Sequence, residues 1–131
     1  MTNNLLVSYT AMIGREYRQL DDNGLYEGCM FPLFYTFPKM KEMAQAIIGD
    51  AIDSENKIQR LLKSFMDPID PKDIKPGDIV LIQHLNLTHV GLYVGNYRFV
   101  HCSTAHSLMF SKYRTYDQRI GGIYRIKEEY R

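Results

Sequence analysis

The stretch that decides the fold is HVGLYVGNYRFVH, residues 89–101. It carries little charge, is rich in β-branched and aromatic residues, and contains the turn formers Gly95 and Asn96 near its middle. This pattern predicts two β-strands joined by a tight turn. Two of the four histidines in the chain, His89 and His101, stand at its ends. Because side chains alternate between the two faces of a strand, the length of the turn decides whether these histidines can meet.

A two-residue turn at Gly95 and Asn96 would send His89 and His101 to opposite faces of the hairpin. We expect the next common type, a three-residue loop over residues 95–97. The pairs that this loop predicts are Val94 with Arg98, Leu92 with Val100, and Gly91 with His101. His101 is then the diagonal neighbour of His89, about 7–8 Å away, within reach of two imidazoles.

The same register sorts the hairpin into two faces. One face carries His89, Gly91, Tyr93, Phe99, His101 and Ser103, and the other carries Val90, Leu92, Val94, Arg98, Val100 and Cys102. We expect the first face to hold a polar site and the second to belong to the core.

Upstream of the hairpin the spacing of apolar residues predicts helices. A first helix ends near Gly14, and two later helices cover residues 38–50 and 53–66, with Asp53 or Ser54 as the N-cap of the last. Between the first helix and the one over residues 38–50, the stretch CMFPLFYTF (residues 29–37) is apolar on nearly every side, which is typical of a buried helix. Because Pro32 is tolerated only near a helix start, Cys29 should lie at or just before the helix N-terminus.

The character of the chain changes at residues 66–78, which we interpret as a surface linker rich in proline and charge. Four strand-like runs follow, at residues 79–85, 88–95, 97–103 and 121–127. Helices followed by an antiparallel meander predict an α+β fold in one domain, residues 1–131. The part from 1 to 66 is mainly helical and the part from 75 to 127 is mainly β.

The composition is that of a small soluble domain, with 131 residues, 45% hydrophobic and 24% charged residues, and a net charge of +1. A chain without a basic run is not expected to bind nucleic acid. There is no apolar run of the roughly 20 residues that a membrane span requires. The N-terminal residues lack the pattern of a signal peptide, so we expect synthesis in the cytoplasm. The two cysteines are too few for a disulfide scaffold.

The histidine pair could have a structural, a metal-binding or a catalytic role. The simplest interpretation is that both are ordinary hydrogen-bonded strand residues. A zinc site is disfavoured, because the four histidines lack the spacing of a metal motif and no acidic residue is an obvious further ligand. We expect neither a metal nor a cofactor.

A histidine that is oriented by a second polar residue can serve as the base for a thiol nucleophile. Alternation points Cys102 into the predicted core, where a thiol is inert. Cys29 differs, because the positive end of a helix dipole favours its thiolate form. The candidate set is therefore Cys29, His89 and His101, although a buried cysteine that merely begins an apolar helix would have the same sequence.

These residues carry a resemblance to a known family. The runs 75–83 and 88–103 resemble the NlpC/P60 superfamily of papain-like cysteine peptidases, and are especially similar to the small versions in tail proteins of long-tailed phages. The matching motifs are Pro76-Gly77-Asp78, His89-Val90-Gly91 and Phe99-Val100-His101. The closing run, residues 118–126, resembles the last strand of that family. The resemblance implies a papain-like fold, with N-terminal helices packed on a C-terminal antiparallel sheet.

The resemblance also implies roles for residues. Cys29 stands in the place of the nucleophile, His89 is the base, His101 is the third polar residue, and Tyr17 stands where a tyrosine of the oxyanion site is expected. The family motif has an aspartate before its cysteine and small residues after it, whereas this chain has Gly28 before Cys29 and the bulky residues 30 and 31 after it.

Three functions are compatible with the resemblance. The first is a thiol hydrolase that cuts peptidoglycan stem peptides, in the tail tip of a phage virion where it aids wall penetration or tail assembly beside other tail proteins. The second is a catalytically inactive tail or hub protein that keeps the fold, which the altered nucleophile motif motivates. The third, an acyltransferase of the permuted branch, is disfavoured because no Asn-Cys-Glu-type motif follows His101.

Overall fold

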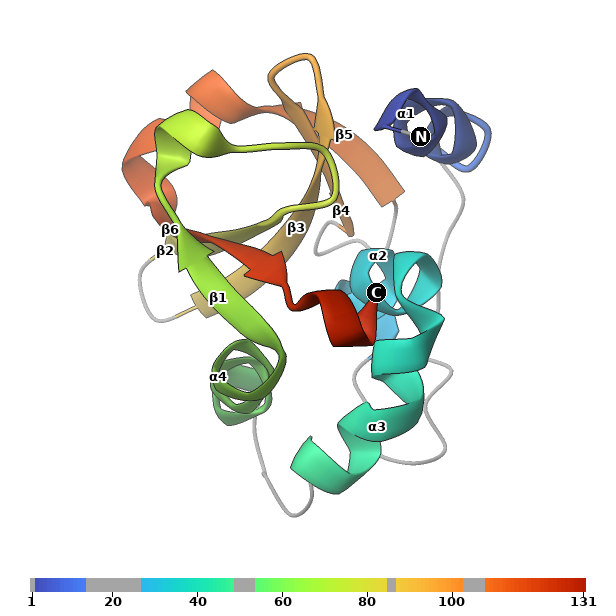
Figure 1. Cartoon of the computed structure of the whole chain (residues 1–131). Helices are drawn as coiled ribbons and strands as arrows, with labels where there is room; N and C mark the ends of the chain where they lie inside the picture. Colours follow the sequence, from blue (N-terminus) through green and yellow to red (C-terminus); the bar gives the residue numbers. More distant parts are fainter. Residues whose placement is uncertain (1, 14–26, 49–53, 85–86, 103–107) are drawn as a thin grey trace.

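The computed structural model describes residues 2–13, 27–48, 54–84, 87–102 and 108–131 (Figure 1). Four helices come first along the chain: α1 (Thr2–Thr10), α2 (Glu27–Thr36), α3 (Pro38–Ile48) and α4 (Ser54–Phe65). The first helix ends at Thr10, earlier than the predicted end near Gly14. Within this described part, none of the helices is long and apolar enough to span a membrane.

The strands that follow form one six-stranded antiparallel sheet in the order β1-β6-β2-β3-β4-β5. Their bounds are β1 (Met66–Ile69), β2 (Ile79–His84), β3 (Leu87–Gly95), β4 (Arg98–Cys102), β5 (Leu108–Lys112) and β6 (Ile120–Ile126). Short 3-10 helices lie at η1 (Pro71–Asp73), η2 (Tyr113–Arg119) and η3 (Glu128–Tyr130). Strands β2, β3 and β4 lie side by side as predicted, but β5, which was not predicted, occupies the place next to β4. The run predicted as the last strand of the meander, β6, pairs instead with the opposite edge of β2. The predicted α+β class is confirmed.

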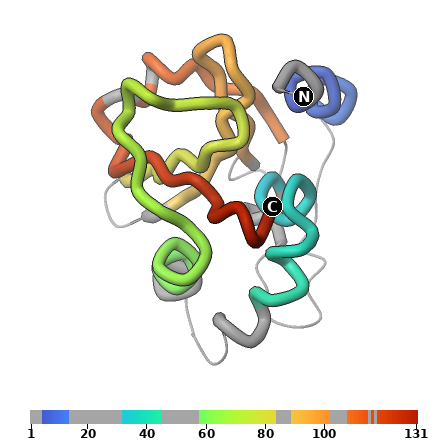
Figure 2. Tube along the Cα trace, in the orientation of Figure 1, coloured from blue at the N-terminus to red at the C-terminus, as the bar shows by residue number. Residues whose placement is uncertain are grey.

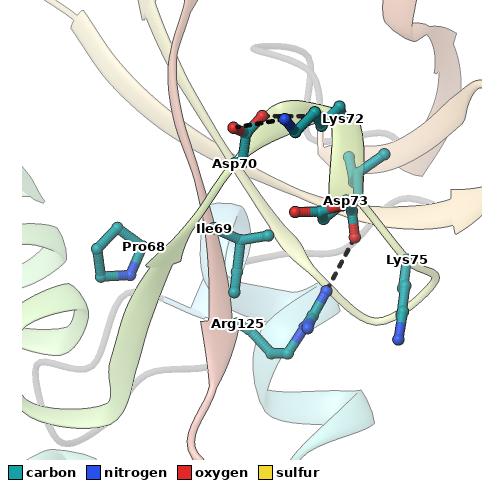
Figure 3. Close-up of a pocket in the computed structure, with 8 residues that line it drawn as sticks. Pro68, Ile69, Asp70, Lys72, Asp73, Lys75 and Arg125 are labelled. Carbon is teal, nitrogen blue, oxygen red and sulfur yellow. Dashed lines mark hydrogen bonds and ion pairs between the residues drawn. The ribbon is translucent and has the colours of Figure 1, made fainter.

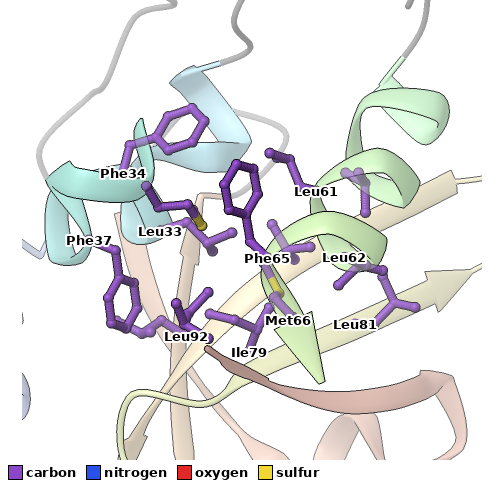
Figure 4. Packing of buried hydrophobic residues seen from close by; sticks show 14 of the residues in the cluster. Leu33, Phe34, Phe37, Leu61, Leu62, Phe65, Met66, Ile79, Leu81 and Leu92 are labelled. Atoms are coloured by element: carbon purple, nitrogen blue, oxygen red, sulfur yellow. The ribbon is translucent and has the colours of Figure 1, made fainter. Parts of the chain in front are cut away.

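The main core lies between the helices and one face of the sheet. Helices α1, α2 and α4 contact strand β3, and α2 also contacts β4. Buried side chains from both layers meet there, among them Leu33, Phe65 and Leu92 (Figure 4). The η3 segment closes one end, because the ring of Tyr130 packs edge-on against Phe65 with centroids 4.8 Å apart.

The other face of the sheet holds a second apolar cluster, and this corrects the expectation of a polar face. Its buried members are Val80, Ile82, Tyr93, Phe99 and Ile123. Tyrosines of the η2 segment, Tyr113 and Tyr116, pack against them. Because the sheet is covered on both faces, His101 lies at the border of an apolar cluster and not on an open polar surface.

Strand β1 was not predicted, because its residues fall in the stretch interpreted as a linker. It pairs antiparallel with β6, from Met66 opposite Ile126 to Ile69 opposite Ile123. Pro68 disfavours a strand, yet β1 is the edge of the sheet, where a missing backbone donor is tolerated. Between β1 and β2 the chain makes a wide loop before it re-enters the sheet (Figure 2).

The hairpin turn also differs from the prediction. Arg98 pairs with Gly95 and not with Val94, so the loop has two residues, Asn96 and Tyr97. Both have positive φ, 55° and 57°, which is the conformation of a type I′ turn. A register shift between Tyr93 and Gly95 inserts one extra residue on β3. This bulge compensates for the shorter loop, so the predicted pairing of Leu92 with Val100 is confirmed.

The turn yields a stability prediction. Tyr97 adopts a left-handed conformation that costs a non-glycine residue about 1–2 kcal/mol, and its side chain is 76% exposed. Tyr97→Gly creates the Asn-Gly pair that this turn prefers, and should stabilise the fold by about 0.5 kcal/mol after the greater freedom of glycine in the unfolded chain is subtracted. Urea unfolding at pH 7 measures the change. Lower stability of the variant would show that the side chain of Tyr97 contributes more than its conformation costs.

An ion pair between a buried carboxylate and a partly exposed guanidinium joins the start of β2 to β6. Asp78 is 2% exposed, and its carboxylate accepts hydrogen bonds from Nε of Arg125 at 2.8 Å and from a terminal guanidinium nitrogen at 2.9 Å. It also accepts the backbone N–H of Lys75 at 2.8 Å, which closes the turn before β2. The same guanidinium donates to the carbonyl of Asp73 at 3.1 Å (Figure 3). These bonds to Asp78 raise the pKa of Arg125 above its ordinary value.

Candidate functional site

The two histidines at the ends of the quoted stretch lie in direct contact. Nε2 of His89 on β3 is 3.1 Å from Nδ1 of His101 on β4, and the two rings meet edge-on at 75°. His89 is half-buried and His101 is 5% exposed. The extra residue of the bulge keeps them on one face, and the structure therefore brings together two of the predicted site residues.

A third polar side chain, Ser111, completes this row. Its Oγ on β5 lies 2.7 Å from Nε2 of His101, and the residue is 9% exposed. Phe99 on β4 pairs with Ser111 on β5, and His101 stands two residues beyond Phe99 on the same strand. The side chains of Phe99, His101 and Ser111 therefore lie on the same face of the sheet. The strands thus carry a continuous chain of hydrogen bonds from His89 through His101 to Ser111.

Aromatic rings enclose the imidazole of His101. The centroid of Phe99 lies 5.1 Å away and that of Tyr116 on η2 lies 5.9 Å away. Burial, and next the nearby imidazole of His89, lower the pKa of His101 to about 4. The imidazole is therefore neutral at pH 7, and each of its nitrogens can either donate or accept one hydrogen bond, depending on the tautomer.

The low pKa of His101 predicts a pH-dependent stability. Unfolding returns this pKa from about 4 to the ordinary 6.5, so the unfolded chain binds more protons between these values. The resulting stability is fully present above pH 6.5 and is lost as the pH falls toward 4. Between pH 7 and pH 5 the loss should be about 2 kcal/mol. Urea unfolding at pH 7 and at pH 5 measures this loss. His101→Gln, whose side chain cannot titrate, should lose about 2 kcal/mol less stability between the two pH values than the wild type does. Equal losses in the two proteins would contradict the prediction.

Cys29 is the third residue of α2, in its first turn, close to the predicted place at or just before the helix start. The helix contacts strands β3 and β4, which carry the two histidines. Pro32 is the sixth residue of α2, so the helix begins further before this proline than we expected from the sequence. The side chain of Cys29 and the whole of Tyr17 lie outside the described residues, so their predicted roles stay predictions.

Sequence reasoning missed Ser111 and Tyr116. Residues 108–112 read LMFSK, which alternates well enough for a strand, but no turn motif marks the pairing with β4 that places Ser111 beside His101. Tyr116 lies on a 3-10 segment, for which hydrophobic periodicity gives no signal. Among the residues that the structure describes, no group of three His, Cys, Asp or Glu side chains is placed to hold a metal ion.

A separate hollow of about 510 Å³ lies beside the loop between β1 and β2 (Figure 3). It is lined by Pro68, Ile69, Asp70, Lys72, Asp73, Ile74, Lys75 and Arg125. The guanidinium of Arg125 is held by Asp78, and Asp70 accepts the backbone N–H of Lys72 within its own turn. The polar side chains of Arg125 and Asp70 in this hollow therefore have structural roles.

Comparisons with known proteins give the chain a family context. The family model described as "NlpC/P60 family" matches residues 40–121. Among solved structures, NlpC2 and NlpC1 from Trichomonas vaginalis each match with a TM-score of 0.57 and 22% identity over 95% of this chain. A protein similar to a lipoprotein of the NLP/P60 family from Staphylococcus aureus matches with a TM-score of 0.57 and 14% identity.

The chain covers 46%, 42% and 41% of those three solved chains, which is less than half of each. At these identities the likeness shows the fold. A search of curated proteins finds no match.

Proposed function

Because the chain belongs to the NlpC/P60 family, whose members are generally cell-wall peptidases, we propose that it is a cysteine hydrolase that cleaves a peptide bond in the stem peptide of peptidoglycan. The observation that carries the proposal is the hydrogen bond between Nε2 of His89 and Nδ1 of the neutral, buried His101. A thiol nucleophile is activated by an adjacent base, and a further polar group that orients this base completes the arrangement.

In the proposed reaction, Nδ1 of His89 takes the thiol proton of Cys29, because Nε2 of His89 is bonded to His101. The thiolate sulfur attacks the peptide carbonyl carbon, and the carbon–nitrogen bond breaks as His89 gives the proton to the leaving amine. Water then attacks the thioester, with His89 again as base, and releases the new carboxylate and the free thiol. His101 orients His89 throughout.

The position of Cys29 in the first turn of α2 supports its proposed role. The N–H groups of that turn have no partner within the helix, and the positive end of the helix dipole favours a thiolate. The backbone N–H of Cys29 and the hydroxyl of Tyr17 are proposed donors to the oxyanion of the tetrahedral intermediate. The proposal needs no metal or cofactor.

The test is digestion of purified peptidoglycan by the full chain, with products identified by mass spectrometry. The expected products are a shortened stem peptide and a new free amine. Treatment with iodoacetamide should stop the digestion, because alkylation removes the nucleophile. Unchanged peptidoglycan after prolonged incubation with folded protein would reject the proposal.

One observation favours a second candidate, a non-catalytic structural protein with the same fold. The residues after Cys29 are Met30 and Phe31, where the family motif has small residues, and Gly28 stands in place of its aspartate. Bulk beside a thiol can obstruct the approach of a substrate. In that case the digestion above gives no product, while the chain stays folded and binds a partner protein.

We further propose that the protein is made in the cytoplasm and acts from the tail of a phage virion, either in wall penetration or in tail assembly with other tail proteins. The support is the resemblance of the hairpin and of the closing run 118–126 to small phage tail domains. Immunogold labelling of purified virions tests this location, and label confined to host fractions would contradict it.

A further inference from the structure

The hydroxyl of Ser111 is buried in contact with His101. The two hydrogen bonds that the structure gives the imidazole of His101 within its described part go to His89 on one side and to Ser111 on the other. The aromatic rings of Phe99 and Tyr116 also lie close to the imidazole. Within the described residues, the hydrogen bond of Nε2 of His101 is therefore the one with the hydroxyl of Ser111 at 2.7 Å.

A neutral His101 has two tautomers, and they act on His89 in opposite ways. With the proton on Nδ1, His101 donates to Nε2 of His89 and opposes a proton at that nitrogen. With the proton on Nε2, Nδ1 presents a lone pair that can accept the Nε2 proton of an imidazolium His89. The second tautomer requires an acceptor at Nε2, and a hydroxyl is a group that can serve either as donor or as acceptor.

We propose that Ser111 is a positioning residue, whose hydroxyl accepts the Nε2 proton of His101 and so turns the Nδ1 lone pair of His101 toward a protonated His89. This inference rests on the proposed function, in which His89 becomes an imidazolium when it takes the thiol proton. Ser111 touches neither the substrate nor the thiol in this proposal, and acts through His101 alone.

Loss of the hydroxyl changes the balance between the two tautomers. Nε2 of His101 then loses its partner in a buried place, and a buried N–H without an acceptor is costly. The proton therefore moves to Nδ1, where it can donate to His89. That tautomer disfavours the imidazolium form of His89, and the rate of the chemical step falls.

The sharpest test compares Ser111→Thr with Ser111→Val, because these side chains have the same shape and differ in a hydroxyl against a methyl. Ser111→Thr should retain kcat within about twofold, whereas Ser111→Val should lose about tenfold in kcat, with KM changed less than twofold. If the β-branched side chains do not fit beside His101, Ser111→Ala, which adds no volume, should show the same loss of kcat as Ser111→Val. Equal kcat in the threonine and valine variants would overturn the proposal.

A second measurement is independent of activity. Nitrogen-15 NMR of the histidine rings at pH 7 shows which nitrogen of His101 carries the proton. The wild type and Ser111→Thr should have it on Nε2, and Ser111→Val should have it on Nδ1. The same tautomer in all proteins overturns the role of Ser111. A tautomer change in a protein that digests no peptidoglycan supports that role and rejects the hydrolase instead.

Discussion

Cys29→Ala should lower the rate of stem-peptide cleavage by a factor of about 10⁴ or more, to the level of the reaction without enzyme nucleophile. The thiol forms and then loses the bond to the acyl group in the proposed reaction, so no neighbouring group can replace it. Binding of the stem peptide should persist, because alanine removes only the sulfur atom. Cleavage is measured by release of free amine, and binding by sedimentation with peptidoglycan.

The chain supplies a matched control in its other cysteine, Cys102 on β4. Cys102→Ala makes the same chemical change one residue after His101, and should retain most of the activity. Iodoacetamide should inactivate the wild type and Cys102→Ala alike, and peptide mapping should find the label on Cys29. Equal cleavage by Cys29→Ala and the wild type would exclude Cys29 as the nucleophile, and inactivation through Cys102 would transfer the role to β4.

The hairpin shows how far the sequence alone could reach. Alternation of side chains, combined with a three-residue loop, predicts that His89 and His101 share a face, and the structure places their ring nitrogens 3.1 Å apart. The turn itself was predicted wrongly, because Asn96 and Tyr97 adopt positive φ and a bulge on β3 restores the register. The sequence gives only a weak signal for a bulge. Here the bulge and the shorter turn together place His89 and His101 on the same face, as the three-residue loop would have done.

Other features depend on contacts between distant segments, which no local pattern reveals. Strand β1 contains Pro68 and pairs with the distant strand β6. Asp67, for example, lies opposite Arg125, 58 positions later in the chain. Ser111 becomes part of the site only because β5 pairs with β4 in one particular register. Cys29 was predicted at or just before a helix start from the local constraint of Pro32, and the helix begins two residues before it, at Glu27.

The bond between Asp78 and Arg125 explains why two separate motifs of the sequence belong together. Asp78 ends the Pro-Gly-Asp turn, and Arg125 lies in the closing strand, 47 positions later. Nε and a terminal nitrogen of the guanidinium each contact one carboxylate oxygen, a geometry in which Arg binds carboxylates most strongly. The pair fixes the start of β2 against β6, and β2 pairs directly with the strand that carries His89. The site is therefore held in place partly by this ion pair.

Asp78→Asn should destabilise the fold by about 3 kcal/mol, a large share of the stability of a domain of this size. The amide keeps the shape of the side chain but loses the charge, and its NH₂ group must face either the guanidinium or the backbone N–H of Lys75. Urea unfolding measures the loss, with Asp67→Asn as the matched control, since the exposed Asp67 on β1 should change stability by less than about 0.5 kcal/mol. In a double-mutant cycle, Arg125→Met should cost much less in the Asp78→Asn background than in the wild type, because the partner charge is already gone. Additive losses in that cycle would show that Asp78 stabilises the fold through its bond to Lys75 and not through Arg125.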